Sequence, residues 1–249
     1  MPQKQRQDQI IQILKTEGFV TVRHLVKTLH YSSATINRDL NAMQDLKIVK
    51  RSYGGVELLS RKDNLPPLPM REFYQAPEKR KIAEAASKLV LDGDCIFLSG
   101  STTTQCMVPF LATKKNLTVI TNSLRIAIEL GEFDIMVICL GGMVTERPFI
   151  TQSDLTVDNA MRYHADKMFF STNLFTEDGV INYAGHLLYR VMMKNSKKVY
   201  YLTDESKLTD RVWHSLCDFS SIDGVISNFD FPQKTKEKYP NADFISINT

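Results

Sequence analysis

Residues 32–45 constrain the fold of this chain most strongly, because they combine one apolar stripe with one polar, cationic face. Ile36, Leu40 and Met43 recur at spacings of four and three residues, which places them on one side of a helix. Ser32 is a good N-cap, since its hydroxyl can accept a hydrogen bond from an amide in the first turn. About half a turn away lie Ala34, Arg38, Asn41 and Asp45, flanked by Thr35 and Asn37. Such a face suits a DNA major groove, but it also suits an ordinary solvent-exposed helix.

The neighbouring segments complete a motif around this helix. Residues 4–16 and 21–29 each carry an apolar stripe of helical spacing, and Gly18 is a suitable helix stop between them. After residue 45, two short extended runs flank a Gly-Gly pair, which is typical of a hairpin turn because glycine accepts positive φ. Helix, turn, helix and hairpin is the order of a winged helix-turn-helix. We predict this fold for residues 1–59.

The net charge of +3 hides an uneven distribution of charge along the chain. Residues 1–62 hold 11 Lys and Arg against 5 Asp and Glu, a balance of +6, which leaves 20 basic and 23 acidic residues, a balance of −3, for the rest. A basic end on a mildly acidic body indicates that the N-terminal part meets a polyanion. A helix-turn-helix used for protein contacts fits this charge less well.

Double-stranded DNA is therefore the expected partner of the N-terminal part. Arg51 belongs to the predicted hairpin, where a cation would release condensed counterions from the phosphate backbone. The predicted DNA-binding residues are Ser33, Thr35, Asn37, Arg38, Asn41, Arg51, Tyr53, Gly54 and Gly55.

Composition excludes several other classes of protein. Hydrophobic residues make up 43% of the chain and charged residues 24%, as in ordinary globular proteins. No apolar run is long enough to span a membrane, and no secretory signal is evident, so we expect a cytoplasmic protein. The four cysteines are far apart, and we expect them to be reduced and mostly buried. The five histidines show no metal-ligand spacing, so we expect neither a metal nor a cofactor.

The remainder of the chain predicts a linker and a second domain. Four prolines fall within residues 60–77, and this density favours an extended linker. From residue 78 to residue 249, strand patterns alternate with helical ones, which predicts a mostly parallel sheet with helices on both faces. The fold class expected is α/β: a winged helix-turn-helix followed by a larger α/β domain.

Polar loops follow several of the predicted strands in residues 78–249. Ligands of parallel sheets bind at the carboxyl ends of the strands, where loops and helix N-termini converge. The loop at 99–103 offers a glycine, hydroxyls and amides that suit a phosphate, although such a loop alone is more often a plain turn. Lys207 could meet a phosphate as a point charge. The predicted ligand-binding residues are Ser99, Gly100, Ser101, Thr102, Thr103, Asn122, Ser123, Gly141, Gly142, Arg147 and Lys207.

Several short motifs recur along the chain in a specific combination. In the N-terminal part they are Ser33-x-Thr35-Ile36-x-Arg38-Asp39-Leu40 and Arg51-x-Tyr53-Gly54-Gly55-Val56. In the second part they are Ile120-Thr121-Asn122-Ser123, Leu140-Gly141-Gly142, Asp166-Lys167-x-Phe169 and Asp204-x-Ser206-Lys207. Together these motifs resemble the DeoR family of bacterial transcriptional regulators.

This resemblance implies a specific biology. It implies a repressor of a carbohydrate-utilisation operon, whose effector domain is similar in fold to ribose-5-phosphate isomerase and binds a phosphorylated sugar. It also implies a homodimer or homotetramer that binds a DNA operator. Asn37 stands where the family usually has an arginine, and an asparagine there could pair with adenine.

An enzyme is the second hypothesis. A sugar-phosphate aldose–ketose isomerase with an accessory domain would need a carboxylate base aimed at its substrate. Asp166 and Asp204 are the candidates, but neither lies in a recognisable isomerase arrangement. We therefore expect no catalytic activity and no catalytic residues.

Overall fold

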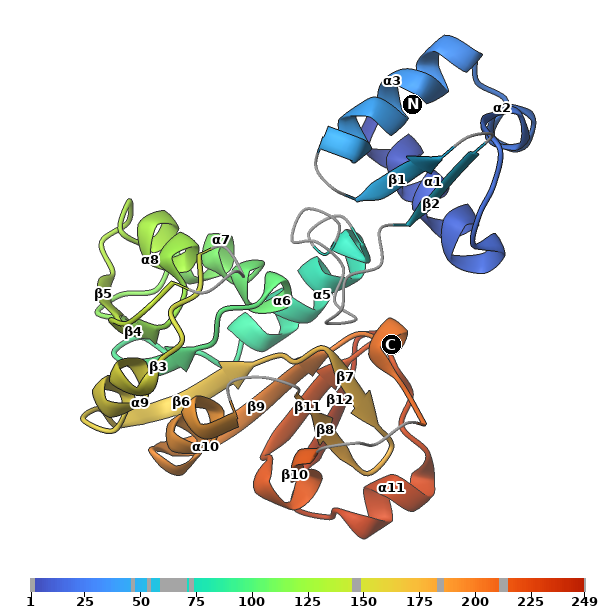
Figure 1. Ribbon diagram of the computed structural model, residues 1–249. Helices are drawn as coiled ribbons and strands as arrows, with labels where there is room; N and C mark the ends of the chain where they lie inside the picture. The colour runs from blue at the N-terminus through green and yellow to red at the C-terminus, as the bar shows by residue number, and fades with distance from the viewer. Residues whose placement is uncertain are drawn as a thin grey trace. The chain divides into compact units, whose positions relative to one another are not determined.

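Two units, residues 1–76 and 77–249, make up the chain in the computed structural model (Figure 1). The structure describes residues 3–45, 48–52, 55–58, 71, 74–144, 149–182, 186–210 and 215–248. Tyr53, Gly54, Arg147 and most of the predicted linker lie outside these ranges. Within the described ranges, no helix has the length and apolar character that crossing a membrane requires.

The N-terminal unit has the predicted order of helices and strands. Its elements are α1 (Gln3–Glu17), α2 (Val22–Leu29), α3 (Ser33–Asp45), β1 (Val49–Ser52) and β2 (Gly55–Leu58). Gly18 ends α1 with φ +76°, and the hydroxyl of Thr21 accepts a hydrogen bond from the His24 amide at 3.1 Å. The Ser32 hydroxyl accepts from the Thr35 amide at 3.1 Å, as an N-cap should. These local signals thus set the helix boundaries.

The small sheet of this unit has an extra partner from the segment before α2. β1 and β2 pair antiparallel, and Val20 exchanges two hydrogen bonds with Val56, at 2.9 and 2.8 Å. A Cβ on Gly55 would lie 2.4 Å from the Val20 carbonyl oxygen. Gly55 does not adopt positive φ, and the close approach of Val20 is what requires a glycine there.

The second unit is built on a seven-stranded sheet. All neighbouring pairs are parallel, in the order β12-β11-β9-β6-β3-β4-β5. These strands are β3 (Cys95–Leu98), β4 (Thr118–Thr121), β5 (Met136–Cys139), β6 (Ala165–Phe170), β9 (Ser196–Thr203), β11 (Gly224–Ser227) and β12 (Asp243–Ser246). The order reverses between β3 and β6, and ligands of open parallel sheets bind at such a switch point. The predicted α/β class is confirmed.

Helices cover both faces of this sheet (Figure 1). One face packs on α5 (Ala76–Ser87), α6 (Thr102–Gln105), α7 (Val108–Leu111) and α8 (Leu124–Leu130). The other packs on α9 (Asp154–Ala160), α10 (His186–Lys194) and a three-stranded antiparallel sheet of β7 (Leu174–Thr176), β8 (Gly179–Ile181) and β10 (Ser215–Asp218). The remaining elements are the short helices η1 (Glu205–Lys207), η2 (Phe219–Ser221) and α11 (Gln233–Lys238).

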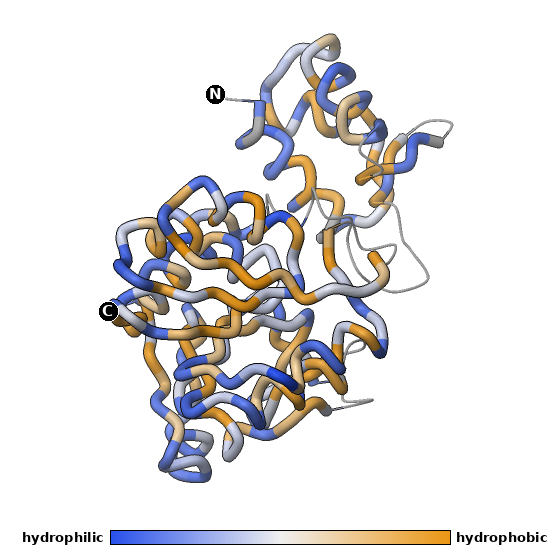
Figure 2. Tube along the Cα trace, turned by 90° about the vertical axis from the view of Figure 1, so that its left-hand side faces the viewer, coloured by the Kyte–Doolittle hydropathy of each residue, from blue (hydrophilic) through white to orange (hydrophobic). Residues whose placement is uncertain are grey.

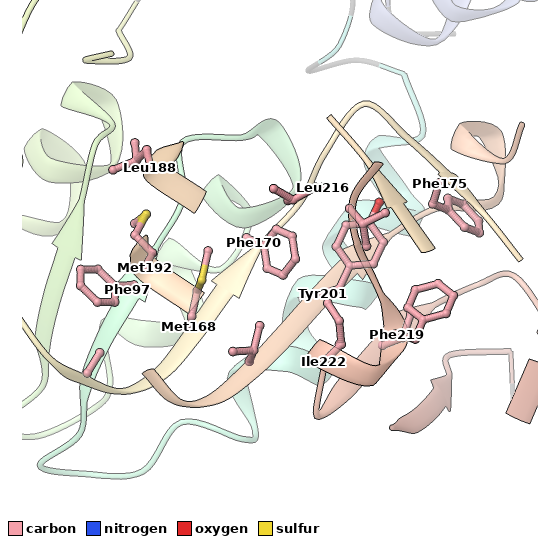
Figure 3. Packing of buried hydrophobic residues seen from close by; sticks show 14 of the residues in the cluster. Phe97, Met168, Phe170, Phe175, Leu188, Met192, Tyr201, Leu216, Phe219 and Ile222 are labelled. Atoms are coloured by element: carbon pink, nitrogen blue, oxygen red, sulfur yellow. The ribbon is translucent and has the colours of Figure 1, made fainter. Parts of the chain in front are cut away.

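Strand alternation divides the core into two clusters of buried side chains. Phe97, Met168 and Tyr201 face one cluster, which Figure 3 shows in close-up, while their strand neighbours Ile96 and Leu202 face the other. Figure 2 shows apolar residues concentrated along the strands in the middle of the unit. A sheet covered on both faces needs such continuous apolar strands.

Several local expectations were wrong. α5 begins at Ala76, within the predicted linker, because Pro77 is tolerated in a first helical turn. α6 and α7 are separate short helices, and the break between them precedes Pro109. The cysteines are not mostly buried: Cys139 is exposed, and Cys95, Cys106 and Cys217 are only partly buried.

Candidate functional site

The recognition helix α3 exposes the polar face that the sequence predicts. Ile36, Leu40 and Met43 are buried in the core of the unit, whereas Ser33, Arg38 and Asn41 are exposed. The Thr35 hydroxyl lies 2.8 Å from that of Ser32 and so belongs to the N-cap. The exposed side therefore offers the guanidinium of Arg38, which has no partner among the residues that the structure describes, and the amide of Asn41.

Arg51 lies on β1, in the hairpin that forms the wing of the helix-turn-helix, and contacts this face of α3. Its guanidinium donates hydrogen bonds from Nη2 to Asn37 Oδ1 at 2.7 Å and from Nη1 to Asn41 Oδ1 at 2.6 Å. Asn37 and Asn41 are four residues apart, so they stack on one side of α3. The predicted DNA-binding residues Asn37, Asn41 and Arg51 thus form one connected group.

A buried ion pair on the other side of α3 was not predicted. The Asp39 side chain is buried, and both its oxygens accept hydrogen bonds from Arg6 of α1, at 2.5 and 3.0 Å. This pairing raises the pKa of the Arg6 guanidinium, chiefly through the hydrogen bond to Asp39. The only signal for it in the sequence was that Asp39 lies on the apolar side of the predicted helix, between Ile36 and Leu40.

In the second unit, Lys207 bridges the loops at the switch point. It follows β9, and its Nζ donates to Ser171 Oγ at 2.8 Å, after β6, and to Thr103 Oγ1 at 3.2 Å, after β3. Asp204 is fully buried, with Oδ2 3.6 Å from the same ammonium. Three strand ends therefore converge on one cation. Ser171 was missed as a site residue, although it directly follows β6.

Asn122 locks the neighbouring loops together. Its Oδ1 accepts from the Gly100 amide at 2.9 Å, and its Nδ2 donates to the Thr151 carbonyl at 3.1 Å. The Thr151 hydroxyl in turn donates to the Leu140 carbonyl, directly before Gly141, at 2.7 Å. The loops after β3, β4 and β5 thus meet as predicted, but Asn122 is engaged in holding them.

The glycines and serines of these loops have distinct local roles. Ser101 and Ser123 cap α6 and α8 by accepting from the Thr104 and Ile126 amides at 3.0 and 3.3 Å. Gly142 has φ +137°, and a Cβ there would lie 2.1 Å from Thr156 Oγ1 in α9. Gly141 lies beside it with more room.

The hydroxyl of Ser99 is buried at the switch point. Ser99 follows β3, is 1% exposed, and its Oγ makes no hydrogen bond to any part of the chain that the structure describes. Thr102 opens α6 and is partly exposed. Buried polar atoms are nearly always hydrogen-bonded, so a water or a ligand is expected at Ser99.

The two carboxylates considered for isomerase chemistry are placed unfavourably. Asp166 lies at the start of β6, the end of the sheet opposite Lys207, where it accepts from the Cys95 amide at 2.9 Å and from Lys197 at 2.8 Å. These two contacts hold the pKa of Asp166 below its ordinary value. Asp204 is at the correct edge, but it is fully buried, with the Ser206 hydroxyl and Lys207 against it.

Two other features of the described residues bear on binding. No three His, Cys, Asp or Glu side chains gather in these ranges so that they could hold a metal ion. A shallow hollow of about 410 Å³ lies at the amino ends of β6 and β9, lined by His164, Asp166, Lys194 and Lys197 among others. It contains none of the predicted effector residues.

The family assignment rests on two matches that together span most of the chain. The model of the DeoR-like helix-turn-helix domain matches residues 6–62, and that of the DeoR C-terminal sensor domain matches residues 74–228, more than half of the chain. The chain belongs to the DeoR family. The predicted family is thereby confirmed.

Named relatives of this DeoR family protein are transcriptional regulators. The HTH-type transcriptional regulator GolR of Listeria innocua is 31% identical over 242 residues, covering 96% of this chain and 95% of GolR. The glycerol-3-phosphate regulon repressor of Escherichia coli is 28% identical over 92% of each chain. The lactose phosphotransferase system repressor of Lactococcus lactis is 30% identical over 83% of this chain and 84% of that protein.

Among solved structures, ribose 5-phosphate isomerase A from Neisseria gonorrhoeae is similar over 54% of each chain, with a TM-score of 0.40 and 19% identity. Similarity of this degree says nothing about function.

Proposed function

We propose that this protein is a DNA-binding repressor of carbohydrate-utilisation genes, controlled by a phosphorylated sugar. The observation that carries the DNA-binding part is the exposed face of α3, where Arg38, Asn41 and Arg51 lie together in a DeoR-like helix-turn-helix domain. Small amides beside arginines suit base edges in a major groove. The glycerol-3-phosphate regulon repressor and the lactose phosphotransferase system repressor, both relatives, support the regulatory role.

The effector is proposed to bind at the switch point of the second unit. Lys207 supplies the positive charge for a phosphate, and Ser171 and Thr103 supply hydroxyls within 3.2 Å of its ammonium. The unpartnered hydroxyl of Ser99 fits a polyhydroxylated ligand. A phosphate bound here would compete with Asp204 for the ammonium, which couples ligand binding to a buried ion pair.

Control of DNA binding requires two arrangements of the protein. A ligand shifts their balance only if its affinity for the two differs. We propose a homodimer or homotetramer, because a repeated or palindromic operator is read by symmetric copies of α3.

A salt titration tests the DNA-binding role. The full chain is bound to duplexes that it selects from a random pool, and the dissociation constant is measured between 50 and 200 mM salt. We expect affinity to fall by about 10³-fold or more if six or more phosphates are contacted. An affinity that is flat in salt contradicts the proposal.

An isomerase remains the alternative function, and the geometry disfavours it. Asp166 lies at the wrong edge of the sheet, and Asp204 is fully buried. Incubation of the protein with ribose 5-phosphate tests this directly, since turnover would overturn our assignment.

A further inference from the structure

Arg51, in the β1–β2 hairpin that forms the wing, contacts the recognition helix α3. Successive side chains of a strand point to opposite faces, so Arg51 and Lys50 of β1 diverge. Lys50 lies 4.0 Å from Glu57 on β2, and its side chain is 62% exposed. Arg51, by contrast, is partly buried and contacts α3 at both Asn37 and Asn41. The two cations of the wing therefore occupy different environments.

The amide of Asn37 is fully engaged within the protein. Its Nδ2 donates to the Ser33 carbonyl at 2.8 Å and to the Ser33 hydroxyl at 3.2 Å, while its Oδ1 accepts from Arg51. An asparagine that reads adenine needs both its donor and its acceptor free. Asn37 would have to give up these contacts to do so, which makes it a support for Arg51 instead of a base reader.

The guanidinium of Arg51 keeps donors to spare. Arginine carries five N–H donors, and only two of these meet described residues, both of them amide oxygens. No described carboxylate neutralises it. It is thus a charged, planar fork, held at two points on the exposed side of the helix. A fork of this kind matches the O6 and N7 atoms of guanine.

We propose that Arg51 reads a guanine in the operator, and that Asn37 and Asn41 are the positioning residues that hold it there. This inference rests on the proposed function, in which α3 enters a DNA major groove. In this arrangement the guanidinium of Arg51 lies beside Asn37, the position of α3 that has an asparagine instead of an arginine. Contact with a phosphate is the competing role for Arg51, and the two roles differ in their dependence on base sequence.

The test is selection of duplexes from a random pool by the full chain, followed by affinity and salt measurements on single-base variants of the selected site. For the wild type we expect one guanine per half-site whose replacement weakens binding about tenfold or more. Arg51→Lys keeps the charge but not the fork, so it should lose that preference while the salt dependence stays unchanged. Asn37→Ala should weaken the preference at the same base pair only. Lys50→Gln, the matched control, should leave every base preference intact.

Other outcomes overturn the inference. If Arg51→Lys retains the wild-type preferences, or weakens all sequences equally, Arg51 contacts the backbone. If Arg51→Lys does not fold, as its thermal unfolding will show, Asn37→Ala decides, and unchanged preferences in that variant contradict the proposal. A wild-type chain that selects no duplex would instead remove the proposed DNA-binding function itself.

Discussion

The carboxylate of Asp39 on α3 is held by the guanidinium of Arg6 on α1 through two hydrogen bonds, so the first helix of the chain fixes the recognition helix from behind. Asp39 is fully buried and cannot rely on water for solvation. This ion pair is a structural element of the DNA-binding unit.

Removing one partner of this pair should destabilise the N-terminal unit. Asp39→Ala leaves the Arg6 charge without its acceptor, and we expect a loss of about 2–3 kcal/mol in the free energy of unfolding. Asp45→Ala, at the exposed end of the same helix, is the control and should change it by less than about 0.5 kcal/mol. Urea unfolding followed by circular dichroism measures the free energy of unfolding of both variants. Equal effects of the two substitutions would show that the pair contributes little.

Lys207→Ala should abolish effector binding. In a thermal-shift panel of phosphorylated hexoses and pentoses, a bound ligand raises the melting temperature of the wild type by mass action. The variant loses the ammonium that Thr103, Ser171 and Asp204 surround, so its own melting temperature should not respond to the same ligand. Lys238→Ala, whose exposed ammonium pairs with Asp178, serves as the control and should respond normally. A retained shift in Lys207→Ala would remove Lys207 from the site.

Asp166 should contribute to stability in a pH-dependent manner. Its pKa is lowered from 3.8 in the folded state by the Cys95 amide and Lys197, so folding favours the charged form. The contribution is therefore present above pH 3.8 and is lost as the pH falls through the lower, folded-state pKa.

The variant Asp166→Asn tests this. Because the side chain is partly exposed, we expect a loss of only about 1 kcal/mol at pH 7. The difference from wild type should shrink as the pH is lowered below 3.8. A difference that stays constant or grows on acidification would contradict the assignment.

Gly142 should tolerate no side chain. A Cβ there would lie 2.1 Å from Thr156 Oγ1 and 2.6 Å from Ser153 Oγ, in addition to the strain of φ +137°. We expect Gly142→Ala to cost about 2–4 kcal/mol of stability. Gly93 has φ +81° but no atom within 4 Å of such a Cβ. Gly93→Ala therefore measures the cost of the backbone conformation alone, which we expect to be about 1 kcal/mol. Similar losses in both variants would mean that the contacts at Gly142 relax.

The parts of the fold that the sequence predicted are those governed by neighbouring residues. Thr21 and Ser32 cap helices by accepting hydrogen bonds from amides three residues further along the chain. The strand β3 is evident in the sequence as an apolar run. The roles of Asp39 and Asn122 were not predictable in this way, since Asp39 pairs with Arg6, 33 positions away, and Asn122 with Gly100, 22 positions away. Such long-range pairing depends on how the helices and strands pack.

The candidate sites show the same division. The parallel topology predicted that the loops after β3, β4 and β9 would meet, and Lys207 does contact Thr103. The orientation of Arg51 depends on the register in which it faces Val56, and no local pattern specifies that register. The sequence therefore indicated Arg51 as a cation near DNA but not its contacts with Asn37 and Asn41.

The most direct test of the central claim measures both functions in one tube. Fluorescence anisotropy of the full chain on its selected duplex is followed while phosphorylated sugars are added one at a time. We predict tight, sequence-dependent binding that changes at least fivefold with one of these sugars and not with its unphosphorylated form, as coupling free energies of about 1 kcal/mol or more require. Specific binding that no phosphorylated sugar alters, or binding with no preference among duplexes, would contradict the account.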